Sequence, residues 1–181
     1  MNSSNNSPLR GLGGEFFLIG FMGSGKSYWG KIWAEKSGLN FIDLDELIEA
    51  KEKKSIADIF AINGEDHFRD KEAGVLKSLA GTNNCIIACG GGTACYHDNM
   101  KWMNEHGTTV YLESTVKEIF DRVLREQEKR PLIKKMGMTE LYTFIEQKLK
   151  EREPFYNKAT YSLPTEELNV TSFEKLITHN L

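Results

Sequence analysis

The chain has 181 residues, of which 40% are hydrophobic and 27% charged, an ordinary composition for one globular domain with a substantial core. With 23 basic and 26 acidic side chains its formal net charge is −3, and no basic tract or concentrated Lys/Arg face is present. This balance argues against binding to nucleic acid or to an anionic membrane. Any anionic ligand must therefore be held by a few positioned arginines and backbone amides.

The two ends of the chain and its cysteines bear on the cellular compartment of the protein more than on its function. We expect residues 1–14 to be a disordered leader and residues 15–181 to be a single domain. The leader lacks a basic end followed by an apolar run, so we expect no signal peptide, and no segment reaches the roughly 20 apolar residues that cross a bilayer. Cys85, Cys89 and Cys95 form no C-x-x-C pair, which disfavours a zinc site or a disulfide framework and fits a reducing cytoplasm.

Short apolar runs alternate with helical patterns, which is typical of βα units around a parallel sheet. EFFLI (residues 15–19) predicts a first strand that ends directly in a glycine loop. The next helix should end at Gly38. Its buried face is expected to carry Tyr28, Trp29, Ile32 and Trp33. NFIDLD (residues 40–45) predicts a second strand.

The second half of the chain continues this alternation. Ser55 should cap a helix that ends near Gly64, and a longer helix should follow from about residue 65 to 79. CIIAC (85–89) and TTVYLE (108–113) predict two more strands, the latter followed by a helix that starts near Thr115. The charged, aperiodic segment at about 126–138 is a lid candidate. A helix over 139–156, a weak strand at TYSL and a short terminal helix complete the prediction.

A phosphate-binding motif, G-x-x-x-x-G-K-S, runs from Gly20 to Ser27. Its glycines let the loop curl so that successive backbone N–H groups face one point, next to the positive end of the following helix. Lys26 is expected to contact the β- and γ-phosphates, and the Ser27 hydroxyl to ligate Mg²⁺. The residues expected to contact ATP here are Gly23, Ser24, Gly25, Lys26, Ser27 and Tyr28.

Two aspartates, Asp43 and Asp45, stand where the second strand should finish. On a strand, residues two apart point to the same face, so both carboxylates are expected beside the phosphate loop. One would then support hydrated Mg²⁺, and the other would orient an acceptor hydroxyl and take its proton. In the alternative interpretation, Asp45 is a helix N-cap and the second acid is solvated.

Two arginines lie on helix faces that should otherwise be apolar. Arg152 follows Leu141, Ile145 and Leu149 on one helical stripe, and Arg69 lies at the edge of another. The planar guanidinium suits a carboxylate ligand, but an internal salt bridge would also explain each of them. Arg130, in the proposed lid, is placed to swing onto the transferring phosphates; its alternative is a solvated loop charge.

Gly90, Gly91 and Gly92 come directly after a buried strand. They allow a ligand to approach the backbone closely, whereas a plain tight turn seldom needs three glycines. Many phosphate-loop ATPases carry a metal-binding acid at this place. Since none is present here, we assign the indirect contact with Mg²⁺ to Asp43.

Six stretches taken in order, GFMGSGKS, FIDLDELIE, SIADIFAINGEDHFRDKE, GGGT, KRPLI and EREPFY, resemble shikimate kinases. The resemblance runs from about Phe16 to the C-terminus. It implies a three-layer α/β/α phosphate-loop fold of the nucleoside-monophosphate-kinase type, with a five-stranded parallel sheet in the order 2-3-1-4-5 and a lid. It also implies Mg²⁺-dependent transfer of the ATP γ-phosphoryl group to the 3-hydroxyl of shikimate, in the biosynthesis of chorismate and the aromatic amino acids.

The resemblance further implies a role for each matching residue. Asp45 meets the acceptor hydroxyl, and Arg69 and Arg152 hold the substrate carboxylate. Gly90, Gly91 and Gly92 contact the ring hydroxyls, with Gly91 in first place. Lys26 and Arg130 act on the phosphates, and Arg122 has the spacing of an arginine that stacks on adenine. Tyr28 departs from the pattern, because relatives often carry Thr or Ser there.

Three other functions match the sequence less well. A gluconate kinase would also bind a hydroxylated acid, but the G-E-x-x-F-R helix and the R-x-P-x-Y stretch disfavour it. A GTPase would need an N-K-x-D guanine-binding motif, which the sequence lacks, and a mechanical ATPase would need the acid noted above. We therefore expect a cytoplasmic, monomeric enzyme that uses ATP and shikimate.

Overall fold

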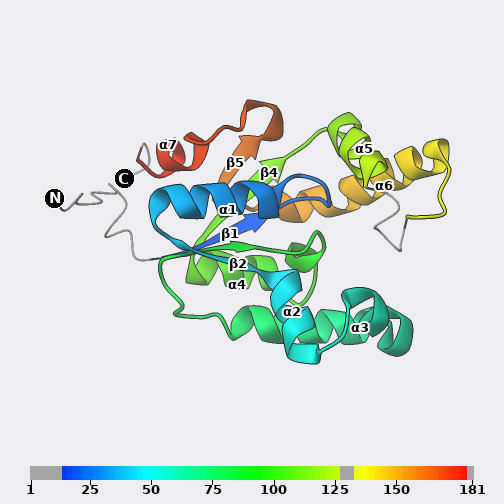
Figure 1. Cartoon of the computed structure of the whole chain (residues 1–181), viewed down its shortest axis with the longest axis horizontal. Coiled ribbons are helices and arrows are strands. Elements are labelled where there is room, and N and C mark those ends of the chain that lie inside the picture. Colours follow the sequence, from blue (N-terminus) through cyan, green and yellow to red (C-terminus); the bar gives the residue numbers. More distant parts are fainter. Residues whose placement is uncertain (1–13, 127–132, 179–181) are drawn as a thin grey trace.

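The structure is a computed structural model that describes residues 14–126 and 133–178. Five parallel strands form one sheet in the order β2-β3-β1-β4-β5 (Figure 1). They are β1 (Glu15–Ile19), β2 (Asn40–Asp43), β3 (Cys85–Ala88), β4 (Thr108–Glu113) and β5 (Tyr161–Pro164). The expected sheet and its strand order are thus confirmed. The expected leader, apart from Gly14, and residues 127–132 of the expected lid, which include Arg130, lie outside the described residues.

Helices connect the strands and end largely where the sequence predicts. They are α1 (Lys26–Ser37), α2 (Leu44–Glu52), α3 (Ile56–Lys77), α4 (Asn99–His106), α5 (Val116–Arg125), α6 (Met138–Tyr156) and α7 (Ser172–Thr178). Gly64 has a non-helical backbone (φ 82°, ψ 172°) that divides α3 into the two helices expected from the sequence. Among the described helices, α4 was not predicted, and α2 was expected only in the alternative interpretation of Asp45.

Side-chain alternation along the strands divides the core into two halves. Phe16 and Leu18 of β1 point to the face covered by α1 and α7, where they pack with Trp33 and Phe173. Phe17 and Ile19 point to the opposite face, which α2 to α6 cover. Figure 1 shows α1 crossing in front of the sheet and α4 behind it. The result is the three-layer α/β/α arrangement that the resemblance implies.

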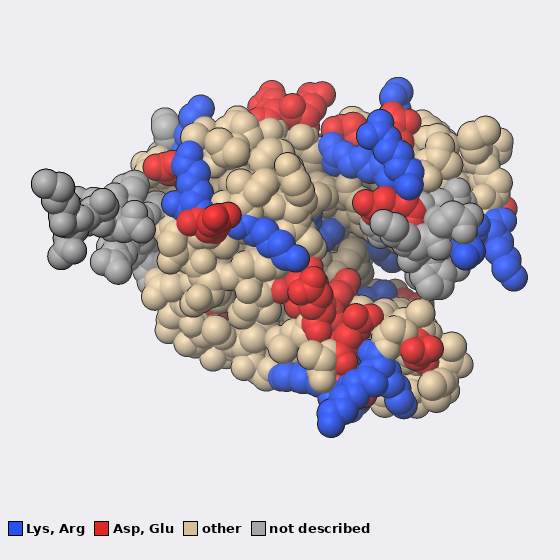
Figure 2. All heavy atoms as spheres, viewed as in Figure 1, with Lys and Arg blue, Asp and Glu red and all other residues tan. Residues whose placement is uncertain are grey.

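Parallel pairing brings the loops after three neighbouring strands, β1, β2 and β3, to one edge of the sheet. Leu18 of β1 and Asp43 of β2 both align with Ala88 of β3, so these strands end at nearly the same level. The phosphate loop after β1, the aspartates after β2 and the glycines after β3 therefore meet at the carboxyl edge, where open α/β sheets bind ligands. Figure 2 shows a hollow between the part of the surface formed by α2 and α3 and that formed by α5 and α6.

The helix ends confirm several capping predictions. The Ser55 hydroxyl accepts the Asp58 N–H at the start of α3, and Thr115 with Glu118 forms a capping box at the start of α5. Gly38 ends α1 in the left-handed conformation that favours glycine. Within residues 14–126 and 133–178, no helix combines the length and the apolar character needed to span a membrane.

Candidate active site

The phosphate loop has the curled backbone that its glycines predict. Gly20, Gly23 and Gly25 all have positive φ values, of 141°, 78° and 91°. A Cβ atom on Gly20 would lie 2.8 Å from the Leu112 carbonyl oxygen, so a side chain is excluded there for steric reasons as well. Because α1 begins at Lys26, the first N–H groups of a 12-residue helix point toward the loop and favour an anion.

Lys26 lies beneath this loop with only 8% of its surface exposed. Its ammonium group donates to the carbonyl oxygens of Gly20 and Phe21, each at 2.8 Å. These bonds fix the position of the charge against the backbone of the loop. A phosphate group held by the loop would therefore meet a positioned cation.

Two oxygen-bearing side chains meet beside the start of α1. The Ser27 hydroxyl donates to Asp43 Oδ2 at 2.5 Å, and Asp43 Oδ1 accepts the N–H groups of Asp45 (3.1 Å) and Glu46 (3.3 Å). The helix cap is thus Asp43, not Asp45 as the alternative interpretation had it. A hydroxyl and a carboxylate at this place are the oxygen ligands that Mg²⁺ prefers.

The route by which Asp45 reaches the site differs from the prediction. The strand β2 ends at Asp43, and Asp45 belongs to the first turn of α2, so strand alternation was the wrong reason for placing the two carboxylates together. The helix cap at Asp43 turns the chain instead. The partly buried Asp45 carboxylate then faces the glycine turn after β3, because a Cβ atom on Gly90 would lie 2.8 Å from Asp45 Oδ1.

The surroundings of Asp45 make its carboxyl group a weaker acid than usual. Burial, together with the nearby carboxylates of Glu72 and Asp43, raises its pKa to about 6, although Lys26 and Arg69 oppose the rise. A carboxylate with a pKa near the working pH is suited to accept a proton from a hydroxyl group. This is the protonation behaviour expected of a general base.

Arg69 is buried, with 7% of its surface exposed, and carries the internal ion pairs that the sequence left open as an alternative. Its guanidinium donates to Glu72 Oε2 at 2.8 Å and to Glu65 Oε1 at 2.9 Å. It also lies over the ring of Tyr96, 4.4 Å from the ring centroid. Glu65 is half-exposed, whereas the Glu72 side chain is 1% exposed. Glu65 therefore has room to move away from Arg69, and Glu72 does not.

Arg152 ends the buried stripe of α6 as the spacing predicts. Leu141, Ile145 and Leu149 are buried, and the Arg152 guanidinium donates to the Gly91 carbonyl oxygen at 3.1 Å. It also lies over the Phe21 ring, 5.3 Å from the centroid. No carboxylate in residues 14–126 or 133–178 forms an ion pair with Arg152. Of the two proposed carboxylate-binding arginines, Arg152 is the one whose charge no described acid pairs.

The three glycines after β3 stand where side chains of the site converge. A Cβ atom on Gly92 would lie 2.6 Å from Arg69 Nη2, and one on Gly90 would lie 2.9 Å from Glu72 Oε1. A Cβ atom on Gly91 would lie 3.1 Å from the Met22 N atom in the phosphate loop. The glycine turn therefore brings Asp45, Arg69, Arg152 and the phosphate loop around one short stretch of backbone.

Three supporting residues of this site, Glu72, Thr93 and Tyr156, were not predicted from the sequence. Glu72 is fully buried and accepts both from Arg69 and, at 2.5 Å, from the Thr93 hydroxyl. The Tyr156 hydroxyl donates to the same Gly91 carbonyl as Arg152. The signal for Glu72 was its i+3 spacing from Arg69 on one helix. Thr93 and Tyr156 lie in the motifs GGGT and EREPFY but had been given no role.

Arg122 of α5 and Tyr28 of α1 are two further residues expected to contact ATP. Arg122 donates to the Gly23 carbonyl oxygen (3.3 Å), to Glu118 (3.2 Å) and to the Thr165 hydroxyl (3.4 Å).

The prediction that Tyr28 belongs to the buried face of α1 was wrong, because 65% of its surface is exposed. Residue 28 points away from the face on which Trp33 is buried.

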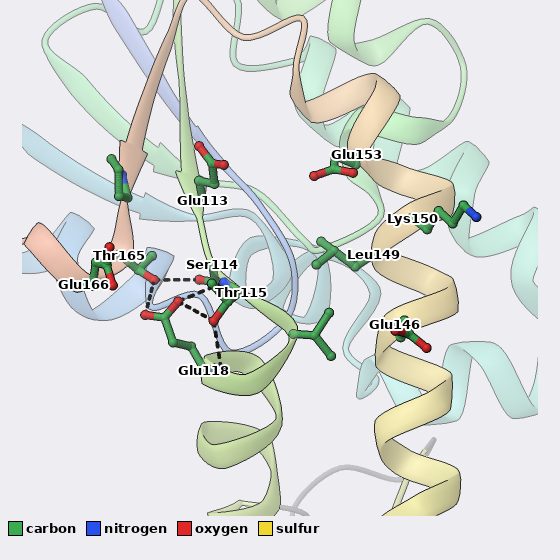
Figure 3. Close-up of a pocket in the computed structure, with 12 residues that line it drawn as sticks. Glu113, Ser114, Thr115, Glu118, Glu146, Leu149, Lys150, Glu153, Thr165 and Glu166 are labelled. Atoms are coloured by element: carbon green, nitrogen blue, oxygen red, sulfur yellow. Dashed lines mark hydrogen bonds between the residues drawn. The ribbon is translucent and has the colours of Figure 1, made fainter.

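A separate cavity of about 510 Å³ lies between the start of α5 and the middle of α6 (Figure 3). Carboxylates dominate its lining: Glu113, Glu118, Glu146, Glu153 and Glu166. Such a lining repels phosphate groups, so this cavity is unsuited to ATP. Figure 3 also shows the hydrogen bonds that join Thr165 to Ser114 and to Glu118 at one wall.

The comparisons with known proteins agree with this geometry. The family model described as shikimate kinase matches residues 22–179. The shikimate kinase of Parabacteroides distasonis is 42% identical over 152 residues, which cover 84% of this chain and 88% of that protein. The shikimate kinase of Azobacteroides pseudotrichonymphae is 46% identical over 145 residues, or 80% of this chain and 85% of that protein.

Solved structures give the same result. The shikimate kinase of Bacteroides thetaiotaomicron superposes with a TM-score of 0.88 at 36% identity, covering 92% of this chain and 99% of that one. The shikimate kinase of Acinetobacter baumannii in complex with shikimate gives a TM-score of 0.82 at 31% identity, covering 92% and 94%. With a full-length family match and a site of this composition, the chain belongs to the shikimate kinase family.

Proposed function

We propose that this enzyme transfers the γ-phosphoryl group of ATP to the 3-hydroxyl group of shikimate and forms shikimate 3-phosphate. The observation that carries the proposal is the glycine turn at residues 90–92, which places Asp45 and two arginines next to the phosphate loop. A relative of the same fold binds shikimate. An acidic ring bearing hydroxyl groups matches a site that combines guanidinium groups with a carboxylate of raised pKa.

The reaction follows from the position of Asp45. Its carboxylate takes the proton of the 3-hydroxyl as that oxygen bonds to the γ-phosphorus, while the bond from phosphorus to the β,γ-bridging oxygen breaks and ADP leaves. The loop amides and Lys26 stabilise the charge on the transferred group. Most of the acceleration in such reactions comes from positioning and from electrostatic stabilisation.

Ser27 and Asp43 are the residues we assign to Mg²⁺. Their oxygens lie 2.5 Å apart at the start of α1, and the Ser27 hydroxyl would bind the ion directly while Asp43 would bind it through water. When bound, Mg²⁺ would neutralise negative charge on the phosphate groups of ATP. The backbone N–H groups that Asp43 caps hold its carboxylate toward Ser27.

Arg152 and Arg69 make different contacts with the substrate carboxylate in this proposal. We assign the primary contact to Arg152, whose guanidinium is held by Gly91 and Phe21 and has no carboxylate partner among the described residues. Arg69 supplies the second contact as the half-exposed Glu65 withdraws, while Glu72 keeps the guanidinium in place. Gly90, Gly91 and Gly92 would then face the ring hydroxyls.

The remaining assignments concern the nucleotide and the setting of the enzyme. We assign Arg122 to the adenine ring and the backbone of residues 23–28 to the phosphates. Arg130, which lies outside the described residues, is proposed to close onto the phosphates with the lid. We further propose a monomeric, cytoplasmic enzyme with residues 15–181 as one domain.

A coupled assay of ADP release tests the function with shikimate and gluconate side by side. We expect turnover with shikimate and Mg²⁺, and at most a trace with gluconate or without an acceptor. Phosphorylation of gluconate in preference to shikimate would favour the alternative kinase. Full ATP turnover without any acceptor would refute the assignment as a small-molecule kinase.

A further inference from the structure

The topology fixes the direction in which a bound nucleotide must run. The acceptor-side groups, Asp45 and the glycine turn, follow β2 and β3, which lie on one side of β1 in the sheet order β2-β3-β1-β4-β5. The γ-phosphate must face that side. The nucleoside must therefore extend toward β4 and β5, on the opposite side of the phosphate loop. The segment that follows β5, residues 165–171, borders this region.

One end of this segment is attached to the phosphate loop through Arg122. The Thr165 hydroxyl accepts from Arg122, which also donates to the Gly23 carbonyl oxygen. Thr165 is in turn bonded to Ser114 at 2.9 Å and to Glu118 at 3.0 Å (Figure 3). The start of the segment is therefore fixed by three polar groups, those of Arg122, Ser114 and Glu118.

The other end of the segment is attached through an aromatic stack. Trp33 is 1% exposed and lies parallel to Phe173 on one side and to Trp29 on the other, with 5.7 Å between ring centroids in both pairs. Its indole N–H donates to the Asn169 carbonyl oxygen at 3.0 Å. At the far end of the stack, the Trp29 ring lies against Gly25 of the phosphate loop, since a Cβ atom on Gly25 would be 3.2 Å from Trp29 Cδ1.

We propose that Trp33 is a positioning residue for the nucleoside end of ATP, acting through the segment 165–171. The Trp29–Trp33–Phe173 stack sets the distance between the phosphate loop and this segment, and the indole N–H fixes the segment at Asn169. This inference rests on the proposed function, because it takes ATP as the ligand of the loop. It assigns no contact between Trp33 and the nucleotide.

The variant Trp33→Phe tests the proposal because it keeps an aromatic ring but removes the N–H donor. The loss of one neutral hydrogen bond corresponds to a change of about 3- to 12-fold in affinity. We expect the KM for ATP and the Kd for ADP to rise by this factor, with the KM for shikimate unchanged within about twofold. The control is Trp102→Phe, because Trp102 packs against Phe17 and His106 on the other side of the sheet.

An unchanged Kd for ADP in Trp33→Phe would overturn the proposal, and so would a parallel rise in both KM values, which would indicate general loss of structure. Should this variant not fold, Phe173→Leu loosens the same stack from its other face and must show the same nucleotide-selective effect. The Kd for ADP, measured by calorimetry, does not depend on the acceptor. A wild-type enzyme that binds ADP but does not phosphorylate shikimate would refute the proposed function and leave this test valid.

Discussion

Replacing Asp45 with asparagine should make the protein more stable and much less active. The carboxyl group of Asp45 is partly buried beside Glu72 and Asp43, and its pKa is raised from 3.8 to about 6. Its ionised form therefore opposes folding. Asparagine has almost the same shape without the charge, so it removes this penalty together with the proposed general base.

The size of the effect follows from the pKa. The rise amounts to about 2 pKa units at about 1.36 kcal/mol each, or an upper bound of about 3 kcal/mol in the free energy of unfolding. Because folding raises the pKa, the wild-type carboxyl favours the folded state only while it is protonated. The advantage of Asp45→Asn should be absent below pH 3.8, reach roughly half its value near pH 5, and be constant above about pH 7.

Urea denaturation of both proteins at pH 5, 6.5 and 8 measures this advantage. The exposed Asp66→Asn serves as the matched control and should change the free energy of unfolding by no more than about 0.5 kcal/mol at any pH. In parallel, kcat of Asp45→Asn should fall by about 10²- to 10⁴-fold with little change in ATP affinity. A variant that is less stable than wild type at pH 8, or equally stabilised at every pH, would refute the account of Asp45. Normal turnover would remove Asp45 from its proposed role.

Four further outcomes are expected. The rate should fall on the acid side with an apparent pKa near 6, as Asp45 becomes protonated, and a profile that is flat down to pH 5 would contradict this. Arg152→Ala should raise the KM for shikimate by roughly 10- to 100-fold without a large loss of stability, whereas a wild-type KM and kcat would exclude the clamp. Arg69→Ala should unfold in less urea, with a loss of about 3–5 kcal/mol, because it leaves Glu72 buried without its ion pair. Chelation of Mg²⁺ should abolish turnover, and added Mg²⁺ should restore it. The variant Ser27→Ala should require more Mg²⁺ for its half-maximal rate. A rate that is insensitive to chelation would exclude a role for the metal.

Much of the fold could be predicted because local signals and long-range packing agree. The strands β1 and β4 match their predicted ranges, since each is a buried apolar run followed by a turn or a capping residue. The short helix α4 was missed because it contains few apolar positions and its N-cap makes no side-chain hydrogen bond. The positions of site residues could be predicted where these residues belong to a sequence motif, as in the phosphate loop and the glycine turn.

The predictions that failed did so for different physical reasons. Asp43 both ends β2 and caps α2, and the local sign of the cap, Glu46 three residues after Asp43, was outweighed by the strand pattern of NFIDLD. Glu72 was overlooked since an acid on a long helix is usually solvated, and only its contacts with Arg69 and Thr93 explain its burial. The wrong prediction for Tyr28 has a local origin: an aromatic residue next to Trp29 on a helix suggests a common buried face, but the helix periodicity turns Tyr28 outward.

The pairing of Arg69 with Glu65 has a consequence for competition among anions. Glu65 follows Gly64, the residue at which α3 breaks, and holds the guanidinium with a half-exposed side chain. Inorganic phosphate or a small carboxylate must displace this tethered carboxylate to reach Arg69, and it brings no ring to fill the space beside the glycine turn. A tethered acid of this kind is an intramolecular competitor that weakens the binding of every anion to Arg69 by the same factor, so a ligand that makes no other contact in the site stays unbound. The enzyme should therefore tolerate cellular phosphate and acetate at concentrations far above that of its substrate.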